Sequence, residues 1–257
     1  GSLDDTQLRT LEERLRYLRE LDDRRATVIK SVNEQGKLTD ALALQFNEAQ
    51  TKNELEDLYL PFKQKRRTKG QIAIEAGLEP LANKLFQHPD ADPETEARQY
   101  IQPDSNFLDT ASVLEGAKFI LMEKFSEDAK LLRQLKDYMW QQADIKSQVI
   151  ESEKAKGEKF QDYFEYSEAI NKIPSHRALA LFRGRNEGFL NVQLQAQNHD
   201  PSDRINPHPC ESQIARHFGI DDKGRGADKW LKEVVRWTWK IKLNMHIETD
   251  LFGKLRE

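Results

Sequence analysis

The sequence predicts a mainly α, multi-helical fold with long helices towards its N and C ends. Charged residues make up 33% and hydrophobic residues 37% of the 257 residues, which suits helices with ion-paired outer faces. Apolar residues recur at helical spacing through most of the chain. Only 145–152 and 188–196 resemble strands, and we expect them to pair as a small two-stranded element packed on helices.

Residues 4–34 are predicted to form one long helix that ends near Gly36. Its first half carries a heptad-like apolar stripe of Leu8, Leu11, Leu15 and Leu18. The stripe then drifts to Leu21, Val28, Ile29 and Val32. Because a strict coiled coil would keep its register, the pattern favours packing inside a helical domain.

Two shorter helices follow in the sequence. Thr39 is placed to cap a helix that carries Phe46. Thr51 and Glu54 have the spacing of a capping box, which predicts a helix from Thr51 to about residue 59. Pro61 ends this helix, because its ring disfavours the helical conformation of the preceding residue.

The second half begins with short helices near 78–86 and after Asp92, followed by a loop near 102–109. Residues 110–143 are predicted to be a long helix with a break near Ser126. Ser175 is predicted to cap another helix, after the first strand.

A loop spans 197–208, a short helix 211–218, and a long helix runs from Ala227 to the end. The apolar face predicted for this last helix is Trp230, Val234, Trp237, Ile241 and Met245. Trp239, Leu243 and Ile247 widen that face, which predicts burial on more than one side.

We expect two domains: an N-terminal helical region over 1–100, and a central helical region over 101–257 that holds the strands. The net charge of −4 excludes a globally basic nucleic-acid binder but leaves local patches open. Cys210 is the only cysteine, so no intrachain disulfide forms. No apolar run approaches the roughly 20 residues that span a bilayer, so no membrane partner is expected.

A basic turn over residues 63–69 is the first candidate binding site. Five of its seven residues are cationic: Lys63, Lys65, Arg66, Arg67 and Lys69. Such a cluster can hold a phosphate backbone by releasing counterions. The alternative is a solvated loop whose positive charges balance the acidic helix that carries Glu54, Glu56 and Asp57.

A second basic face lies between the predicted helix at 175 and the strand that follows it. Its arginines are Arg177, Arg183 and Arg185, with Lys172 and His176 nearby. They indicate either phosphate contact or domain docking, and the alternative is ion pairing within the fold.

No residue pattern predicts catalysis, a metal site or a cofactor. His208, Cys210 and His217 do not match a known zinc spacing. The acidic residues Glu54, Glu56 and Asp57 fit a capped helix better than a magnesium site. We find no glycine-rich phosphate loop or nucleophile elbow, so the expectation is a protein that is not an enzyme.

Three segments closely resemble the N-terminal region of the bacterial Tex family, which are cytoplasmic transcription accessory factors. The longest begins Glu54-Leu-Glu-Asp-Leu-Tyr-Leu-Pro-Phe-Lys and continues from Arg66 to Ala82. The others are Leu3-Asp-Asp-Thr-Gln-Leu-Arg and Pro174-Ser-His-Arg-Ala-Leu-Ala-Leu-Phe-Arg-Gly-Arg-Asn-Glu-Gly188. The resemblance covers nearly the whole chain.

The resemblance implies a helical region that precedes an RNase H-like domain, helix-hairpin-helix elements and an RNA-binding OB-fold domain. It also implies that further helices lie upstream of Leu3. Two functions follow as hypotheses. The chain is either a non-catalytic scaffold that positions downstream domains and assists RNA or DNA binding, or a pure protein-interaction scaffold. The second would dock to RNA polymerase or to C-terminal domains of the same polypeptide.

Overall fold

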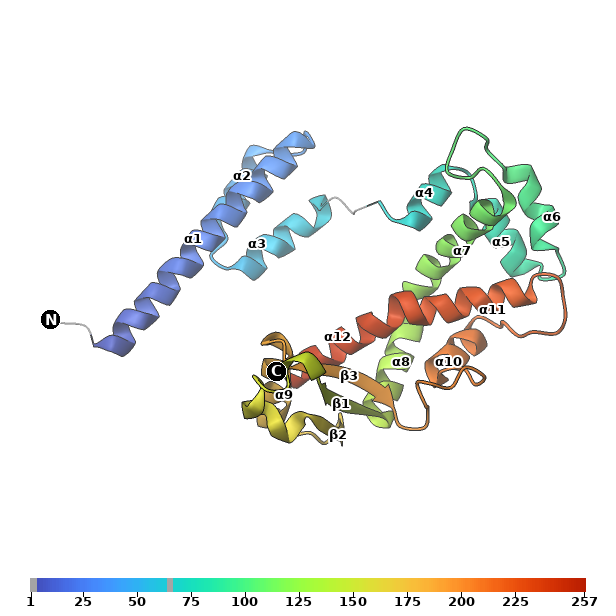
Figure 1. The fold of residues 1–257 in the computed structure, drawn as a ribbon. Helices are drawn as coiled ribbons and strands as arrows, with labels where there is room; N and C mark the ends of the chain where they lie inside the picture. Colours follow the sequence, from blue (N-terminus) through green and yellow to red (C-terminus); the bar gives the residue numbers. More distant parts are fainter. Residues whose placement is uncertain (1–3, 64–66) are drawn as a thin grey trace. The chain divides into compact units, whose positions relative to one another are not determined.

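The computed structural model describes residues 4–63 and 67–257 (Figure 1). The chain forms two compact units, Gly1–Arg66 and Arg67–Glu257, and each has its own hydrophobic core. The predicted domain boundary near residue 100 stays a prediction. In the two described ranges, no helix is both long and apolar enough to cross a bilayer.

The first unit consists of helices. They are α1 (Asp5–Glu34), α2 (Asp40–Glu48), α3 (Lys52–Tyr59) and a 3-10 turn (Leu60–Phe62). Their core buries Leu21, Val28, Val32, Phe46, Ala49, Leu55 and Tyr59. All the buried residues of α1 therefore lie in its C-terminal part, from Leu21 onward.

The N-terminal half of α1 corrects one expectation. The stripe Leu8, Leu11, Leu15 and Leu18, predicted to pack inside a helical domain, is 38–48% exposed. The reason is length, because α2 and α3 have only nine and eight residues against thirty in α1. At about 1.5 Å per residue, they cannot cover a helix more than three times as long.

Most of the predicted helix signals of this unit are confirmed. The reason given for Pro61 is wrong, because Leu60 keeps helical φ and ψ angles and the chain continues through Pro61 as a 3-10 turn. Gly36 follows α1 with a φ of +69°, a conformation that glycine adopts readily. Thr39 caps α2, and Thr51 Oγ1 accepts a hydrogen bond from the Glu54 amide at 3.1 Å. The Glu54 carboxylate instead accepts from the amide of Gln50, one residue before the predicted partner.

The second unit consists of helices and a small sheet, and the sheet lies at one end of the unit (Figure 1). The α-helices are α4 (Lys69–Glu75), α5 (Glu79–Gln87), α6 (Pro93–Ala97), α7 (Thr110–Ser126), α8 (Ala129–Gln142), α9 (Ser175–Asn186), α10 (Pro209–His217), α11 (Asp228–Trp237) and α12 (Asn244–Leu255). Short 3-10 turns cover Arg98–Tyr100, Glu151–Glu153 and Glu158–Tyr163. The predicted break in 110–143 is confirmed, since Asp128 caps α8 by accepting from the Leu131 amide. Ser175 does not cap α9, because it is the first helical residue and Pro174 takes the cap position.

The sheet confirms one predicted strand pair and adds a strand. β1 (Ala143–Val149) pairs antiparallel with β3 (Leu190–Ala196), with Ile145 opposite Leu194. β2 (Glu165–Ala169) pairs with the other edge of β1, so the order is β2-β1-β3 and the predicted two-stranded element is wrong in number. β2 was missed because none of its five residues is fully buried, which leaves no apolar alternation to detect.

The predicted final helix is a rod of α11, a π-helical turn (Thr238–Leu243) and α12, which lies along α7 and α8 (Figure 1). The π turn changes which residues face inward. Trp239, Leu243 and Ile247 are at most 4% exposed, whereas Ile241 and Met245, predicted on the inner face, are 47% and 74% exposed. A turn with an additional residue rotates everything after it relative to the α-helical pattern.

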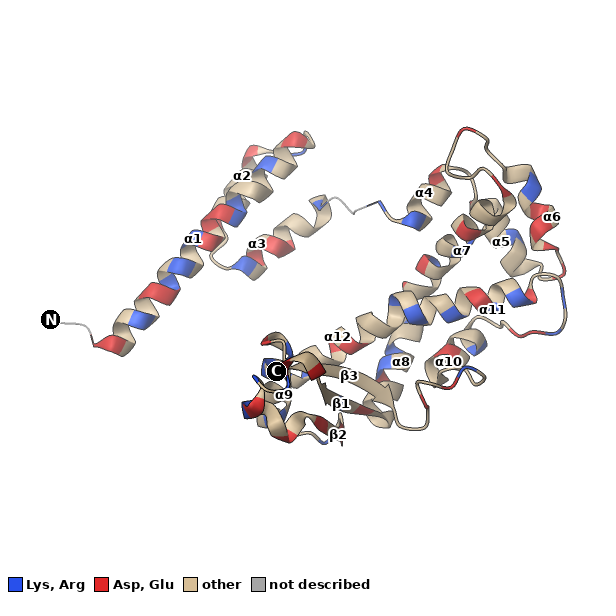
Figure 2. Cartoon of the chain, in the orientation of Figure 1, with Lys and Arg blue, Asp and Glu red and all other residues tan. Residues whose placement is uncertain are grey.

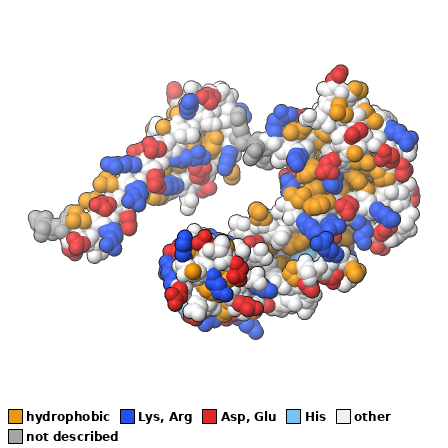
Figure 3. Space-filling view, in the orientation of Figure 1, with side chains coloured by type: hydrophobic (Ala, Val, Ile, Leu, Met, Phe, Trp, Pro, Cys, Tyr) orange, Lys and Arg blue, Asp and Glu red, His pale blue; other side chains and the backbone are white. Residues whose placement is uncertain are grey.

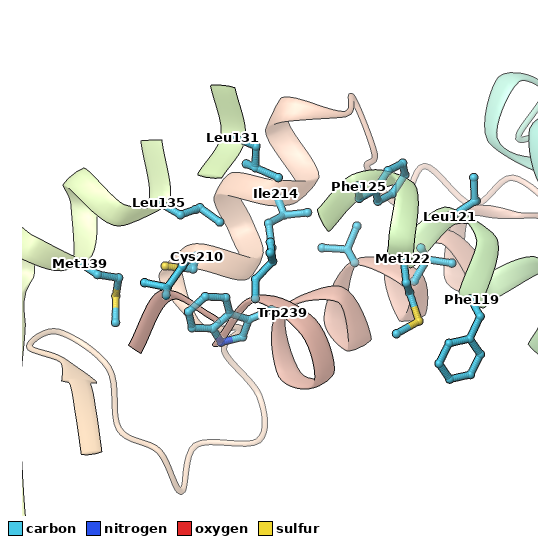
Figure 4. Close-up of a cluster of buried hydrophobic side chains, with 14 of the residues drawn as sticks. Phe119, Leu121, Met122, Phe125, Leu131, Leu135, Met139, Cys210, Ile214 and Trp239 are labelled. Carbon is cyan, nitrogen blue, oxygen red and sulfur yellow. The ribbon is translucent and has the colours of Figure 1, made fainter. Parts of the chain in front are cut away.

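Part of the core of the second unit forms where this rod and α10 meet α7 and α8 (Figure 4). Trp239 lies near Cys210 of α10 and Met139 of α8. Farther along, Phe125 stacks on Phe218 with ring centroids 3.9 Å apart and an interplanar angle of 13°. The packing of aromatic rings at this junction fixes α7 and the end of α10 together.

Replacing Phe125 by alanine is expected to destabilise the second unit by about 3–5 kcal/mol, because a buried ring is removed and leaves a cavity. Urea unfolding followed by tryptophan fluorescence measures this unit alone, since all four tryptophans lie in it. Ile205→Ala is the control, because Ile205 is 91% exposed. An equal loss in both variants would contradict the proposed role of the ring.

Candidate nucleic-acid interface

The predicted basic turn is divided between the two units. Lys63 belongs to the first unit, directly after its 3-10 turn, while Arg67 and Lys69 belong to the second. Lys65 and Arg66 lie outside the described residues. The structure therefore characterises the ends of this predicted site individually.

The part of the turn in the second unit lies beside carboxylates. Arg67 forms an ion pair with Glu75, and the Lys69 ammonium lies 4.9 Å from the centroid of the Phe119 ring. Glu123 of α7 accepts a hydrogen bond from the Gly70 amide at 2.6 Å and another from Thr68. These contacts hold the start of α4 on α7 and supply counter-charges close to the cations.

Arg177 of the second predicted cluster is held by the sheet. Its Nη1 donates to Glu168 Oε2 and to the Tyr166 hydroxyl, both at 2.9 Å. Hydrogen bonds from Tyr166 and then Arg177 lower the pKa of the Glu168 carboxyl. Of the two predicted alternatives, Arg177 thus shows the geometry of ion pairing within the fold.

Of the other two predicted arginines, Arg185 lies beside a third arginine, Arg256, and Arg183 is exposed in the same helical turn. Arg183 and Arg185 lie in the last turn of α9, and Arg256 follows α12. The guanidinium carbons of Arg185 and Arg256 lie 5.2 and 4.6 Å from the centroid of the Phe182 ring. We call Arg183, Arg185 and Arg256 the arginine cluster; Figure 2 shows blue segments on α9 near the C-terminus.

Two physical features suit the arginine cluster to oxyanions. A guanidinium stacked on a ring keeps its N–H groups in the plane, where they can donate to phosphate oxygens. All three arginines also lie at the C-terminal ends of helices, where a positive charge is favourable. Gly184 lets α9 lie close to β3, since a Cβ there would be 2.4 Å from Leu190 Cδ1.

Sequence alone gave no signal for Arg256, because only the tertiary fold brings it to Phe182.

A groove of about 760 Å³ lies between β3, the loop that follows it, α10 and the α11 rod. We call it the β3–α11 groove. Lys232, Arg236 and Lys240 line one wall at four-residue spacing. Figure 3 shows Lys and Arg side chains gathered on this unit next to histidine. The spacing is visible in the sequence, but the prediction assigned that helix only an apolar face.

His208, Cys210 and His217 make separate contacts. His208 Nδ1 accepts from the Cys210 amide at 3.0 Å, and its ring stacks on Trp239 with centroids 4.5 Å apart. Burial lowers the pKa of His208 to about 4 and raises that of the Cys210 thiol to about 12. His217 Nε2 instead lies 3.1 Å from Asp128 Oδ2.

With this geometry established, comparison with known proteins gives the family. A family model described as Tex central region-like matches residues 88–257. The chain belongs to the Tex family. The Transcriptional accessory protein Tex of Neisseria gonorrhoeae is 48% identical over 257 residues, which cover 100% of this chain and 33% of that protein.

Two other relatives match the chain to different extents. Protein YhgF of Escherichia coli K12 is 53% identical over 259 residues, covering 100% of this chain and 33% of that protein. The human S1 RNA-binding domain-containing protein 1 is 29% identical over 206 residues, covering 76% of this chain and 20% of that protein. The chain thus spans about a third of the bacterial Tex relatives, and the resemblance noted in the sequence is confirmed.

Arg177→Ala is expected to change the affinity for a nucleic-acid probe by less than about twofold, because its guanidinium is held by Glu168 and Tyr166. The same change should lower the thermal midpoint of the second unit, since Glu168 loses its partner. Fluorescence anisotropy and thermal unfolding measure the two effects. A large loss of affinity without loss of stability would place Arg177 in a binding site instead.

Proposed function

We propose that this chain is a non-catalytic helical module of a Tex-type transcription accessory protein. It positions neighbouring domains of its polypeptide and contributes cations to RNA or DNA binding, within the cytoplasm. The arginine cluster is the observation that supports the second role most strongly, because Arg185 and Arg256, distant in sequence, place their guanidiniums over the same Phe182 ring, and Arg183 is exposed in the same turn of α9 as Arg185. The predicted basic turn remains a second candidate contact.

The proposal assigns no bond-making step, metal or cofactor to the chain. The sequence supplies no set of nucleophile, base and oxyanion donors. The names of the relatives support the assignment at a coarse level, since one is called a transcriptional accessory protein and another an S1 RNA-binding domain-containing protein. Nucleic-acid contact by electrostatics needs only cations that reach a phosphate backbone.

The triple variant Arg183→Ala, Arg185→Ala and Arg256→Ala is expected to weaken binding of labelled RNA or DNA, and to do so for all sequences alike. If all three arginines contact phosphates, the slope of log affinity against log salt falls by about 2 to 3. Anisotropy titrations at several salt concentrations measure this. A second triple variant, Lys65→Ala, Arg66→Ala and Arg67→Ala, tests the basic turn in the same way.

The control triple is Lys130→Ala, Arg133→Ala and Lys229→Ala, which removes three exposed cations from α8 and α11. It changes the net charge equally, so a general electrostatic effect would appear in both. Equal behaviour of the control and the arginine variant would remove the arginine cluster from the mechanism. If the basic-turn variant binds with unchanged affinity and salt slope, the basic turn does not contribute to binding.

A second function, docking to another protein, is favoured by the leucine stripe of α1. Within the first unit, Leu8, Leu11, Leu15 and Leu18 stay 38–48% exposed along one helix face. An exposed apolar stripe of this kind marks a protein contact. The candidate partners are RNA polymerase and the C-terminal domains of the same polypeptide.

Leu11→Glu combined with Leu15→Glu is expected to abolish such docking, because two charges would have to be buried in the contact. Pull-down with purified RNA polymerase and crosslinking to the separately purified C-terminal part measure it. Leu44→Glu is the control, since Leu44 is 58% exposed on α2 and lies outside the stripe. Undiminished docking of the double variant would exclude the stripe as the contact.

A further inference from the structure

The β3–α11 groove has a wall of regularly spaced positive charges. Lys232, Arg236 and Lys240 are exposed and line the groove together with Asn244. In a uniform α-helix each four-residue step rotates by about 40° beyond a full turn, so this row would turn away over three steps. The π-helical turn Thr238–Leu243 has wider turns, which keeps the row facing the groove.

These cations are only partly neutralised. Among the described residues, the one ion pair within 4 Å in this row joins Arg236 Nη1 to Glu233 at 3.8 Å. The Glu233 carboxylate also accepts a hydrogen bond from Trp237 Nε1 at 2.9 Å. Asp203, across the groove, is turned to its own loop, where it accepts from the amides of Ile205 and Asn206. The row thus has room for an external anion.

Glu211 of α10 is the carboxylate that competes with such an anion. It lines the groove and is half-buried, and burial raises its pKa. Arg236, Lys240 and Lys232 act in the opposite direction and stabilise its charge. The same three cations that would hold a phosphate therefore also interact electrostatically with this carboxylate.

The opposite wall and the floor offer flat rings and amides. The His208 ring stacks on Trp239 with centroids 4.5 Å apart, and the His199 ring meets His208 edge-on with centroids 4.9 Å apart. Trp239 is 4% exposed and forms the floor, while His199 is partly exposed at the groove. Gln193 and Gln195 of β3 line the same space with amide groups, which donate and accept hydrogen bonds.

We infer that the β3–α11 groove binds a single strand of nucleic acid, with phosphates along Lys232, Arg236 and Lys240 and bases against His199 and the glutamines. The inference rests on the proposed function for its class of ligand but uses a site separate from the arginine cluster. Rings and amides suit a single strand, whose unstacked bases expose their faces and edges. A duplex offers its backbone but keeps those base faces within its stack.

The test uses the whole 257-residue chain and two fluorescent probes, a single-stranded oligonucleotide of roughly 12 nucleotides and its duplex. The variant is Lys232→Ala, Arg236→Ala and Lys240→Ala, compared with the control triple Lys130→Ala, Arg133→Ala and Lys229→Ala. We expect the groove variant to lose about tenfold in affinity for the single strand, with a salt slope reduced by about 2. Equal losses in the two triple variants, or a larger loss for duplex, would overturn the inference.

Glu211→Gln provides a test that misfolding cannot imitate. Removing the competing carboxylate is expected to tighten single-strand binding severalfold at neutral pH, since the three cations lose their internal counter-charge. Unchanged or weaker binding would count against the groove. Polyglutamate is the competing probe, and displacement of the oligonucleotide at equal charge concentration would indicate an acidic peptide site instead.

The two proposals fail separately. Loss of binding in the arginine-cluster variant with an unaffected groove variant would leave the proposed function in place and reject the groove. Loss of binding in the groove variant with an unaffected arginine-cluster variant would support the groove and exclude the arginine cluster as a binding site. Circular dichroism of each variant confirms that the helices are retained.

Discussion

Burial of one side of the rod formed by α11, the π turn and α12 is the constraint on which the second unit depends. Leu231, Val234, Leu243 and Ile247 are at most 1% exposed, and the rod packs against α7, α8 and α10. Removing these side chains from water is worth roughly 1.5–3 kcal/mol for each, so the rod has one preferred orientation. That orientation also decides which polar residues face outward, and it therefore places the cationic row of the groove.

The cations of this chain fall into two physical groups. Arg177 and Arg67 have carboxylates within ion-pair distance, so their charges are balanced within the fold. Arg185 and Arg256 lie instead against the Phe182 ring, and the row along α11 faces the groove with a single 3.8 Å ion pair, from Arg236 to Glu233, among the described residues. The net charge of −4 hides this difference, because acidic residues elsewhere compensate the local patches. A bound phosphate backbone interacts with the local electrostatic potential, and the net charge of the chain does not describe that potential.

Much of the fold was predictable because its signals are local. Gly36, Thr39 and Asp128 act at helix ends through neighbouring backbone groups, so their roles follow from sequence spacing. The pairing of β1 with β3 followed from two apolar strands that need a partner. β2 and the π turn were not predictable in this way. β2 is stabilised by its ladder with β1 and not by an apolar pattern, and the π turn depends on how the rod packs.

The sequence by itself determined the helical class, most helix ends, the family resemblance and the presence of clustered cations, because each of these depends on residues close together in the chain. Only the tertiary structure decided which cations are paired and which stay available. Arg177 meets Glu168 across nine residues, and Arg256 meets Phe182 across more than seventy positions. Charge interactions fall off with distance and with access to water, so their outcome depends on the packed structure and not on the order of residues.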